Sequence, residues 1–171
     1  IGQGYFLATP MQLTLATSVL ATDGISYTPH LLKRYINNKT KEIFNYNPEA
    51  NKFITPLDDI NDLDIVRKAM WRVVNEKNVG TASSLKKVKD IEFAGKTGTA
   101  QVYNLDAGTS DKKILQDHAL FISYAPYELP EIVVTVIVEH GGGGSSTAAP
   151  IARDIIDFYM NNKNKKVASN E

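Results

Sequence analysis

The chain has 171 residues, of which 43% are hydrophobic and 22% are charged, a composition that supports a buried core and excludes a disordered tail. Its 19 basic and 19 acidic residues cancel, so no net charge favours nucleic acid or an anionic membrane surface as a partner. The chain contains no cysteine, which excludes disulfides and thiolate metal sites. These values indicate one globular domain or part of one.

The beginning of the chain indicates a fragment. No apolar run approaches the roughly 20 residues that a membrane-spanning helix needs. The sequence opens with IGQGYF, without an initiator methionine or a charged leader. We therefore expect a longer protein of which these residues are one piece.

The first predicted element is a helix in ATPMQLTLATSVLATDG. Thr9 and Gln12 have the spacing of a capping box, and Pro10 suits the first helical position. Gly24 marks its end. Its apolar positions repeat every four residues and predict one buried face: Met11, Leu15 and Val19.

A strand from Tyr27 to Ile36, a polar Asn- and Lys-rich turn and a second strand near Ile43 to Tyr46 are expected next. A second helix is predicted in DLDIVRKAMWRVVN. Its apolar stripe consists of Leu63, Val66, Met70, Val73 and Val74.

The second half has the pattern of a sheet followed by a helix. Strands are predicted from Glu92 to Tyr103, from His118 to Tyr124 and from Ile132 to Val138. The last of these is nearly continuous in β-branched residues, which is typical of a strand covered on both faces. The short turn APYELPE predicts that the last two strands form an antiparallel hairpin in the middle of a sheet.

After the glycine run 141–144, a final helix is expected, followed by a polar tail from Asn161. The residues predicted to share its buried face are Ala148, Ile151, Ile155, Phe158 and Tyr159.

The motif with the most chemical content is EFAGKTGTAQV. A Walker A phosphate loop would need a glycine where Asp90 stands and a helix after the lysine, and neither is present. On a strand, Thr97 and Thr99 share one face while Lys96 points to the other, and Gly98 leaves the backbone open to a substrate. KTG is one of three short motifs of penicillin-binding proteins and β-lactamases. By itself it is equally compatible with a Thr-rich strand after a tight turn.

Other candidate groups have ordinary explanations. SSLKK contains S-x-x-K twice, as Ser83 to Lys86 and Ser84 to Lys87, but its place just before KTG favours a solvated turn over a nucleophile. The histidines, His30, His118 and His140, lack zinc-site spacing. Asp117 adjoins His118, but neighbouring strand residues face opposite sides.

The run Gly141 to Gly144 is interpreted as a flexible connector rather than as an anion site capped by Ser146 or Thr147.

Several segments together carry a specific resemblance. In this order they are IGQGYFLATPMQL, VGTASS, AGKTGTAQV, DHALFISYAPYELPEIVVTVIVEHGGGG and STAAPIAR. From Ile1 to about Tyr159 the chain resembles the C-terminal part of the transpeptidase domain of class B penicillin-binding proteins, most closely the penicillin-binding protein 2 family of cell elongation. In that family the nucleophilic serine and the S-x-N motif precede the GQG segment, so both are expected upstream of this chain.

The resemblance implies an α+β fold of the β-lactamase/transpeptidase type, with a mainly antiparallel sheet and helices packed on both sides. Residues 1–160 would form the C-terminal half of the domain and residues 161–171 a polar tail. It implies a peptidoglycan D,D-transpeptidase that β-lactams acylate. The full-length protein would be an enzyme, and this chain alone is expected to be inactive.

The resemblance also implies residue roles. Lys96 would assist proton transfer, Thr97 and Thr99 would hold the substrate carboxylate beside Gly98, and the Thr99 amide would supply half of the oxyanion hole. No metal or organic cofactor is implied.

The implied partners are peptidoglycan stem peptides ending in D-Ala-D-Ala, β-lactam antibiotics and a membrane glycosyltransferase of the elongation machinery, with no nucleic acid. The implied location is the periplasmic face of the inner membrane, with an N-terminal anchor outside this chain. A related D,D-carboxypeptidase, a β-lactamase and a non-catalytic penicillin-binding-like module remain alternatives.

Overall fold

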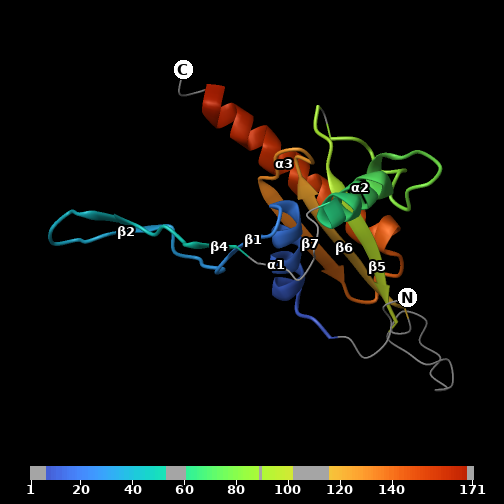
Figure 1. The fold of residues 1–171 in the computed structure, drawn as a ribbon, viewed down its shortest axis with the longest axis horizontal. Helices are drawn as coiled ribbons and strands as arrows, with labels where there is room; N and C mark the ends of the chain where they lie inside the picture. Colours follow the sequence, from blue (N-terminus) through green and yellow to red (C-terminus); the bar gives the residue numbers. More distant parts are fainter. Residues whose placement is uncertain (1–6, 53–60, 89, 102–115, 169–171) are drawn as a thin grey trace.

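The protein, represented by a computed structural model that describes residues 7–52, 61–88, 90–101 and 116–168, has a central antiparallel sheet, flanking helices and a projecting ribbon of short strands (Figure 1). The elements of the first half are α1 (Pro10–Ala21), β1 (Ile25–Tyr27), β2 (Arg34–Ile36), β3 (Ile43–Asn45), β4 (Ala50–Lys52) and α2 (Asn61–Asn75). Those of the second half are β5 (Ala94–Ala100), β6 (His118–Ala125), β7 (Ile132–Val138), the π-helix η1 (Gly144–Ala148) and α3 (Ala149–Ala168).

The central sheet has the order β5-β6-β7, and both pairs of strands are antiparallel. The predicted strands of the second half are confirmed, and β7 has the predicted bounds. Val102 and Tyr103, which were assigned to the first of them, lie outside the described residues. The predicted hairpin is β6–β7, and within the described sheet β6 is the middle strand.

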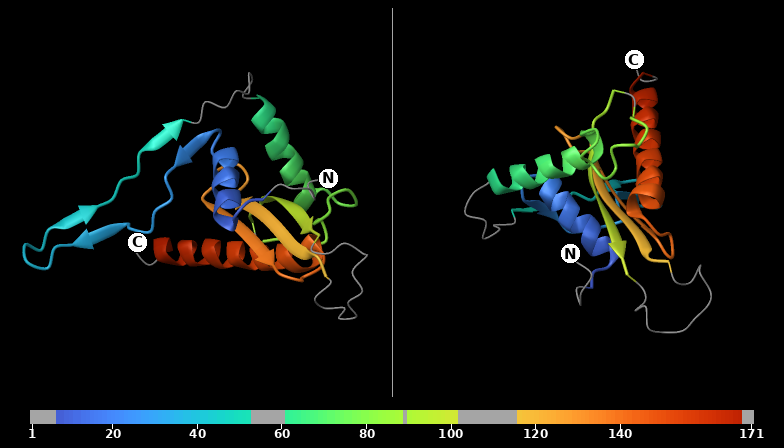
Figure 2. Two further views of the ribbon diagram at one scale, coloured as in Figure 1. Left: turned by 90° about the horizontal axis from the view of Figure 1, so that it is seen from below. Right: turned by 90° about the vertical axis from the view of Figure 1, so that its right-hand side faces the viewer.

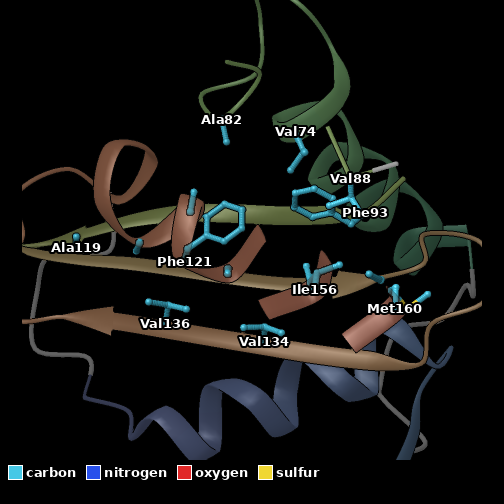
Figure 3. Close-up of a cluster of buried hydrophobic side chains, with 14 residues drawn as sticks. Val74, Ala82, Val88, Phe93, Ala119, Phe121, Val134, Val136, Ile156 and Met160 are labelled. Carbon is cyan, nitrogen blue, oxygen red and sulfur yellow. The ribbon is translucent and has the colours of Figure 1, made fainter. Parts of the chain in front are cut away.

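Helices cover both faces of this sheet, which confirms the predicted layers. α1 lies on one face and α3 on the other, while α2 packs against the edge strand β5 and contributes side chains to both layers, Met70 on the α1 side and Val74 on the α3 side (Figure 2). β6 contributes alternate side chains to both layers, because Phe121 belongs to the cluster on the α3 side and Tyr124 to the cluster with α1 and α2. Both rings are fully buried. Figure 3 shows the larger cluster, in which side chains of Phe93, Val136 and Ile156 come from separate segments.

The first helix begins as predicted but packs on a different face. The capping box of Thr9 and Gln12 is present. Its buried residues are Thr17 and Ala21, whereas Met11 is 60% exposed. The predicted stripe is therefore wrong: small side chains let α1 lie close to the sheet, Leu20 packs against the buried cluster, and Leu15 and Val19 are only partly buried.

The last helix shows the same difference. Ala149, Ala152, Ile156 and Met160 are buried against the sheet. Of the predicted face only Ala148 is buried, and Ile151, Ile155, Phe158 and Tyr159 are exposed. The helix also continues past the predicted tail boundary to Ala168, because neither glycine nor proline follows Asn161 to stop it. None of the described helices is long and apolar enough to cross a lipid bilayer.

Residues 25–52, between α1 and α2, form a narrow ribbon that extends away from the body (Figure 2). The single strand predicted from Tyr27 to Ile36 is wrong, because the chain forms β1 and β2 on either side of Pro29, which has no amide hydrogen for a sheet ladder. β1 pairs with β4, and β2 pairs with β3 across the predicted polar turn. The predicted helix α2 is confirmed, with Met70 and Val74 of its stripe buried.

Arg67 of α2 joins three parts of the α1–α2 layer. Its guanidinium forms an ion pair with Asp23, which follows α1, and donates to the Tyr127 carbonyl oxygen at 3.3 Å in the β6–β7 turn. Burial raises the pKa of the neighbouring Tyr124 phenol, and the positive charge of Arg67 offsets part of that rise. The Arg67 side chain is 12% exposed and the Asp23 side chain 54%, so the ion pair is open to solvent on one side while the bond to Tyr127 is partly buried.

We expect Arg67→Met in the full-length protein to lower the free energy of unfolding by about 1–3 kcal/mol, because it removes bonds to partly buried groups. Arg72→Met on the same helix is the matched control. Among the described residues Arg72 forms its ion pair with Glu76 on the exposed side, and its loss should be within measurement error. Denaturant unfolding of both variants tests this, and equal losses would contradict a special role for Arg67.

Candidate active site

The K-T-G segment lies on β5, at one edge of the central sheet. Pairing with β6 places Lys96 opposite Ile122 and Thr97 opposite Phe121. Because side chains alternate along a strand, Thr97 and Thr99 lie on the face of Phe121, whereas Lys96 lies on the face of Ile122. The predicted alternation is therefore confirmed by the register.

Lys96 reaches the side of β5 that faces away from β6. Its side chain is exposed, and Nζ donates to the Thr97 carbonyl oxygen at 2.7 Å. In an antiparallel strand the amide and carbonyl of one residue point to the same side, and the direction reverses at each residue. The Thr99 amide therefore points to the same side as the Thr97 carbonyl. One strand edge combines a cation, two hydroxyl groups and a backbone donor, which can bind an anion and stabilise a developing oxyanion.

A second segment contacts this edge. The Thr81 and Thr97 hydroxyl oxygens lie 3.0 Å apart. Thr81 belongs to the VGTASS segment after α2, to which the sequence analysis gave no residue role. Nothing in the local pattern indicates this contact, because the two residues are 16 positions apart and come together only through the packing of α2 against β5.

The glycine run covers the same strand from the α3 side. A Cβ atom at Gly144 would lie 2.4 Å from the Leu120 carbonyl oxygen and 2.5 Å from that of Gly98. The interpretation of this run as a flexible connector is wrong at Gly144, which is buried against the K-T-G backbone. The N-cap of η1 is Gly143, so no side chain caps this helix, and Thr147 Oγ1 donates to the Gly141 carbonyl at 2.8 Å.

The predicted decoy lies in a turn. Ser83 and Ser84 belong to the turn 81–84, and Lys86 and Lys87 are exposed beyond it. The Ser83 amide donates to the Gly80 carbonyl at 3.1 Å. This arrangement agrees with a solvated turn.

Two of the three histidines come together. The His140 amide donates to His118 Nδ1 at 2.9 Å, while the His30 ring contacts that of Tyr46 in the ribbon at a tilt of 51°. The adjacent Asp117 carbonyl accepts from the Gly142 amide at 2.8 Å. Within the described ranges no cluster of three or more His, Asp or Glu side chains could hold a metal ion.

Comparisons with known proteins agree with this arrangement. The family model for the penicillin binding protein transpeptidase domain matches residues 1–157. Peptidoglycan D,D-transpeptidase MrdA of Haemophilus influenzae is 41% identical over 173 residues, which cover 95% of this chain and 25% of that protein. The chain thus spans about a quarter of the length of the curated relatives it matches.

Solved structures give the same result. PBP2 of Pseudomonas aeruginosa, determined in complex with WCK 5153, superposes with a TM-score of 0.71 at 36% identity, covering 93% of this chain and 32% of that one. PBP2 of Helicobacter pylori, in complex with MreC, gives a TM-score of 0.67 at 32% identity, covering 98% of this chain and 26% of that one.

The fold is therefore of the β-lactamase/transpeptidase class, as the sequence predicted. Within this class the chain belongs to the penicillin-binding protein transpeptidase family, and its relatives are of the PBP2/MrdA type.

Gly144→Ala tests whether the glycine run supports β5. The added methyl group would meet two backbone oxygens that cannot rotate away, so we expect a loss of about 1–3 kcal/mol in stability. We also expect faster amide hydrogen exchange in β5. Gly143→Ala is the control, because its nearest neighbour is the movable Ser146 hydroxyl. Exchange mass spectrometry of the full-length variants is the measurement, and unchanged β5 exchange in Gly144→Ala would contradict the prediction.

Proposed function

We propose that the protein carrying this chain is a peptidoglycan D,D-transpeptidase that β-lactams acylate. The observation that carries the proposal is the arrangement at the edge of β5. The Lys96 amine and the Thr97 hydroxyl lie at this edge, and the Thr99 amide points to the same side of the strand. Family membership supports it, as do a relative named as a peptidoglycan D,D-transpeptidase and the WCK 5153 complex of PBP2 from Pseudomonas aeruginosa.

The proposed reaction uses a serine from another part of the full-length protein. Its oxygen forms a bond to the carbonyl carbon of the penultimate D-alanine, and the bond to the terminal D-alanine breaks as that amine takes a proton. The amine of a second stem peptide then attacks the acyl group, forms the cross-link and releases the serine. No step requires a metal or an organic cofactor.

The residues of β5 have separate roles in this proposal. Lys96 provides a fixed positive charge that favours the anionic form of a neighbouring hydroxyl and assists proton transfer. The hydroxyl groups of Thr97 and Thr99 donate hydrogen bonds to the terminal carboxylate, and Gly98 leaves room for the peptide. The Thr99 amide stabilises the oxyanion that forms at the attacked carbonyl.

We further propose that residues 1–160 are the C-terminal half of the transpeptidase domain and residues 161–171 its tail. The outward side of α1 supports this, because a groove there is lined by Leu15, Val19 and Leu63, which another part of a domain can cover. For the whole protein we propose the periplasmic face of the inner membrane and a membrane glycosyltransferase partner. The complex of PBP2 with MreC in Helicobacter pylori supports assembly with other proteins in general.

The reaction itself is tested with the full-length protein, a stem peptide ending in D-Ala-D-Ala and a second amine acceptor. A cross-linked product is expected, and mass spectrometry distinguishes it from the hydrolysed peptide that a carboxypeptidase would release. Intact mass after incubation with penicillin should show one adduct per chain. The isolated 171-residue segment should form no adduct. An adduct on it would contradict the proposal that the nucleophilic serine lies outside this chain.

The same adduct assay tests the decoy serines. Changing Ser83 and Ser84 together to alanine should leave acylation of the full-length protein within a few-fold of wild type, because turn hydroxyls without a positioned base are poor nucleophiles. Loss of the adduct in a folded variant would show that the nucleophile is one of these two serines.

Thr99→Val separates the hydroxyl of Thr99 from its backbone amide. We expect acylation by a β-lactam to slow about ten- to a hundredfold, because one hydrogen bond to a charged group contributes about 1.5–3 kcal/mol. A β-lactam methyl ester, whose uncharged oxygen is a poorer acceptor, should be affected much less. Lys96→Ala should slow the reaction more than Thr99→Val. Stopped-flow acylation of both variants with the acid and with the ester is the measurement. Equal slowing of acid and ester in Thr99→Val would show that Thr99 acts through strand geometry.

A further inference from the structure

The contact between Thr81 and Thr97 joins the proposed carboxylate site to the loop after α2. The two hydroxyl oxygens are 3.0 Å apart, and either oxygen can be the donor. Thr97 lies on β5, and its own carbonyl oxygen accepts a hydrogen bond from Lys96 Nζ. Thr81 is therefore within one hydrogen bond of a group that is to bind substrate.

The loop around Thr81 is fixed from both sides. A Cβ atom at Gly80 would lie 2.3 Å from the Val73 carbonyl oxygen, so this residue sits directly against the C-terminal end of α2. The Ala82 amide donates to the same Val73 carbonyl at 3.0 Å, and the Ala82 side chain is fully buried. Both neighbours of Thr81 thus contact α2, which restricts the position of the Thr81 backbone relative to β5.

The direction of the hydroxyl bond follows from the charge of the ligand. A carboxylate accepts hydrogen bonds and cannot donate, so a Thr97 hydroxyl that binds it must point its proton at the ligand. Only a lone pair of the Thr97 oxygen then remains for Thr81, which must be the donor. Consecutive hydroxyl bonds polarise one another, so this arrangement strengthens the bond to the anion.

We propose that Thr81 is a positioning residue of the carboxylate subsite: its hydroxyl donates to Thr97 Oγ1 and turns the Thr97 proton toward the terminal carboxylate of the stem peptide or β-lactam. This inference rests on the proposed function, in which Thr97 binds that carboxylate. It assigns to the VGTASS segment a part in substrate recognition in addition to its part in the fold.

The test uses the full-length protein with a β-lactam and its carboxylate methyl ester. Thr81→Val should slow acylation by the acid about three- to tenfold, the effect of one modest hydrogen bond, and change acylation by the ester by less than about twofold. Thr81→Ser keeps the hydroxyl and should restore the acid rate to within about twofold of wild type. The double variant Thr81→Val/Thr97→Val should be no slower than Thr97→Val alone, because Thr81 acts through Thr97.

Two controls exclude a structural effect. Ser84→Ala removes an exposed hydroxyl from the same turn and should change neither rate. Thr81 is exposed, so Thr81→Ala should also fold. Its melting temperature checks that slower acylation does not result from lower stability. Equal slowing of acid and ester, additive effects in the double variant or no restoration by serine would each overturn the inference.

The same measurements separate this inference from the function on which it rests. A wild-type protein that forms no adduct would overturn the proposed function. A wild-type protein that is acylated, with acid-selective slowing in Thr97→Val and none in Thr81→Val, would leave the function standing and overturn the role of Thr81.

Discussion

The register between β5 and β6 is the constraint on which the candidate site depends. A shift by one residue would exchange the faces of Lys96 and Thr97 and remove the arrangement of the K-T-G edge. Close contact at Gly95 opposes such a shift, because a Cβ atom there would lie 2.4 Å from Cζ of Phe121, whose ring is fully buried. A shift by one residue would place Ala94 or Lys96 at this position and bring a side chain into the ring. The core thus aligns the strand that carries the site.

Packing then adds supports that strand pairing alone does not provide. On the α3 side, Gly144 contacts the backbone at Gly98. At the beginning of β5, the Asn75 side chain at the end of α2 donates to the Phe93 carbonyl at 2.9 Å. Thr81 contacts Thr97 from the loop that follows α2. Since these supports come from the end of α2 and from the loop that directly follows it, the end of α2 and the K-T-G edge are positioned together.

Sequence reasoning predicted what depends on local geometry and failed where layers meet. The capping box at Thr9 and the alternation along β5 follow from fixed helix and strand periods, and the structure contains both. The predicted buried faces of α1 and α3 are wrong, because the side of a helix that meets the sheet depends on tertiary packing; on α3 the large Ile156 is buried while Phe158 is exposed. Thr17 and Ala152 are buried instead, since small side chains permit close approach to a twisted sheet. The Thr81 contact depends on how far α2 packs along β5, which no local pattern contains.

Lys96 also resolves a physical problem of the edge that it occupies. An edge strand presents unpaired amide and carbonyl groups and tends to pair with other chains, and a lysine on the edge is one of the features that prevent this. Here the ammonium group binds the Thr97 carbonyl directly. A peptide that pairs with this edge must compete for that carbonyl, whereas an anion is attracted by the same charge. The side chain that protects the edge from nonspecific strand pairing is therefore suited to ligands that carry a carboxylate, which agrees with the stem-peptide terminus that we propose as substrate.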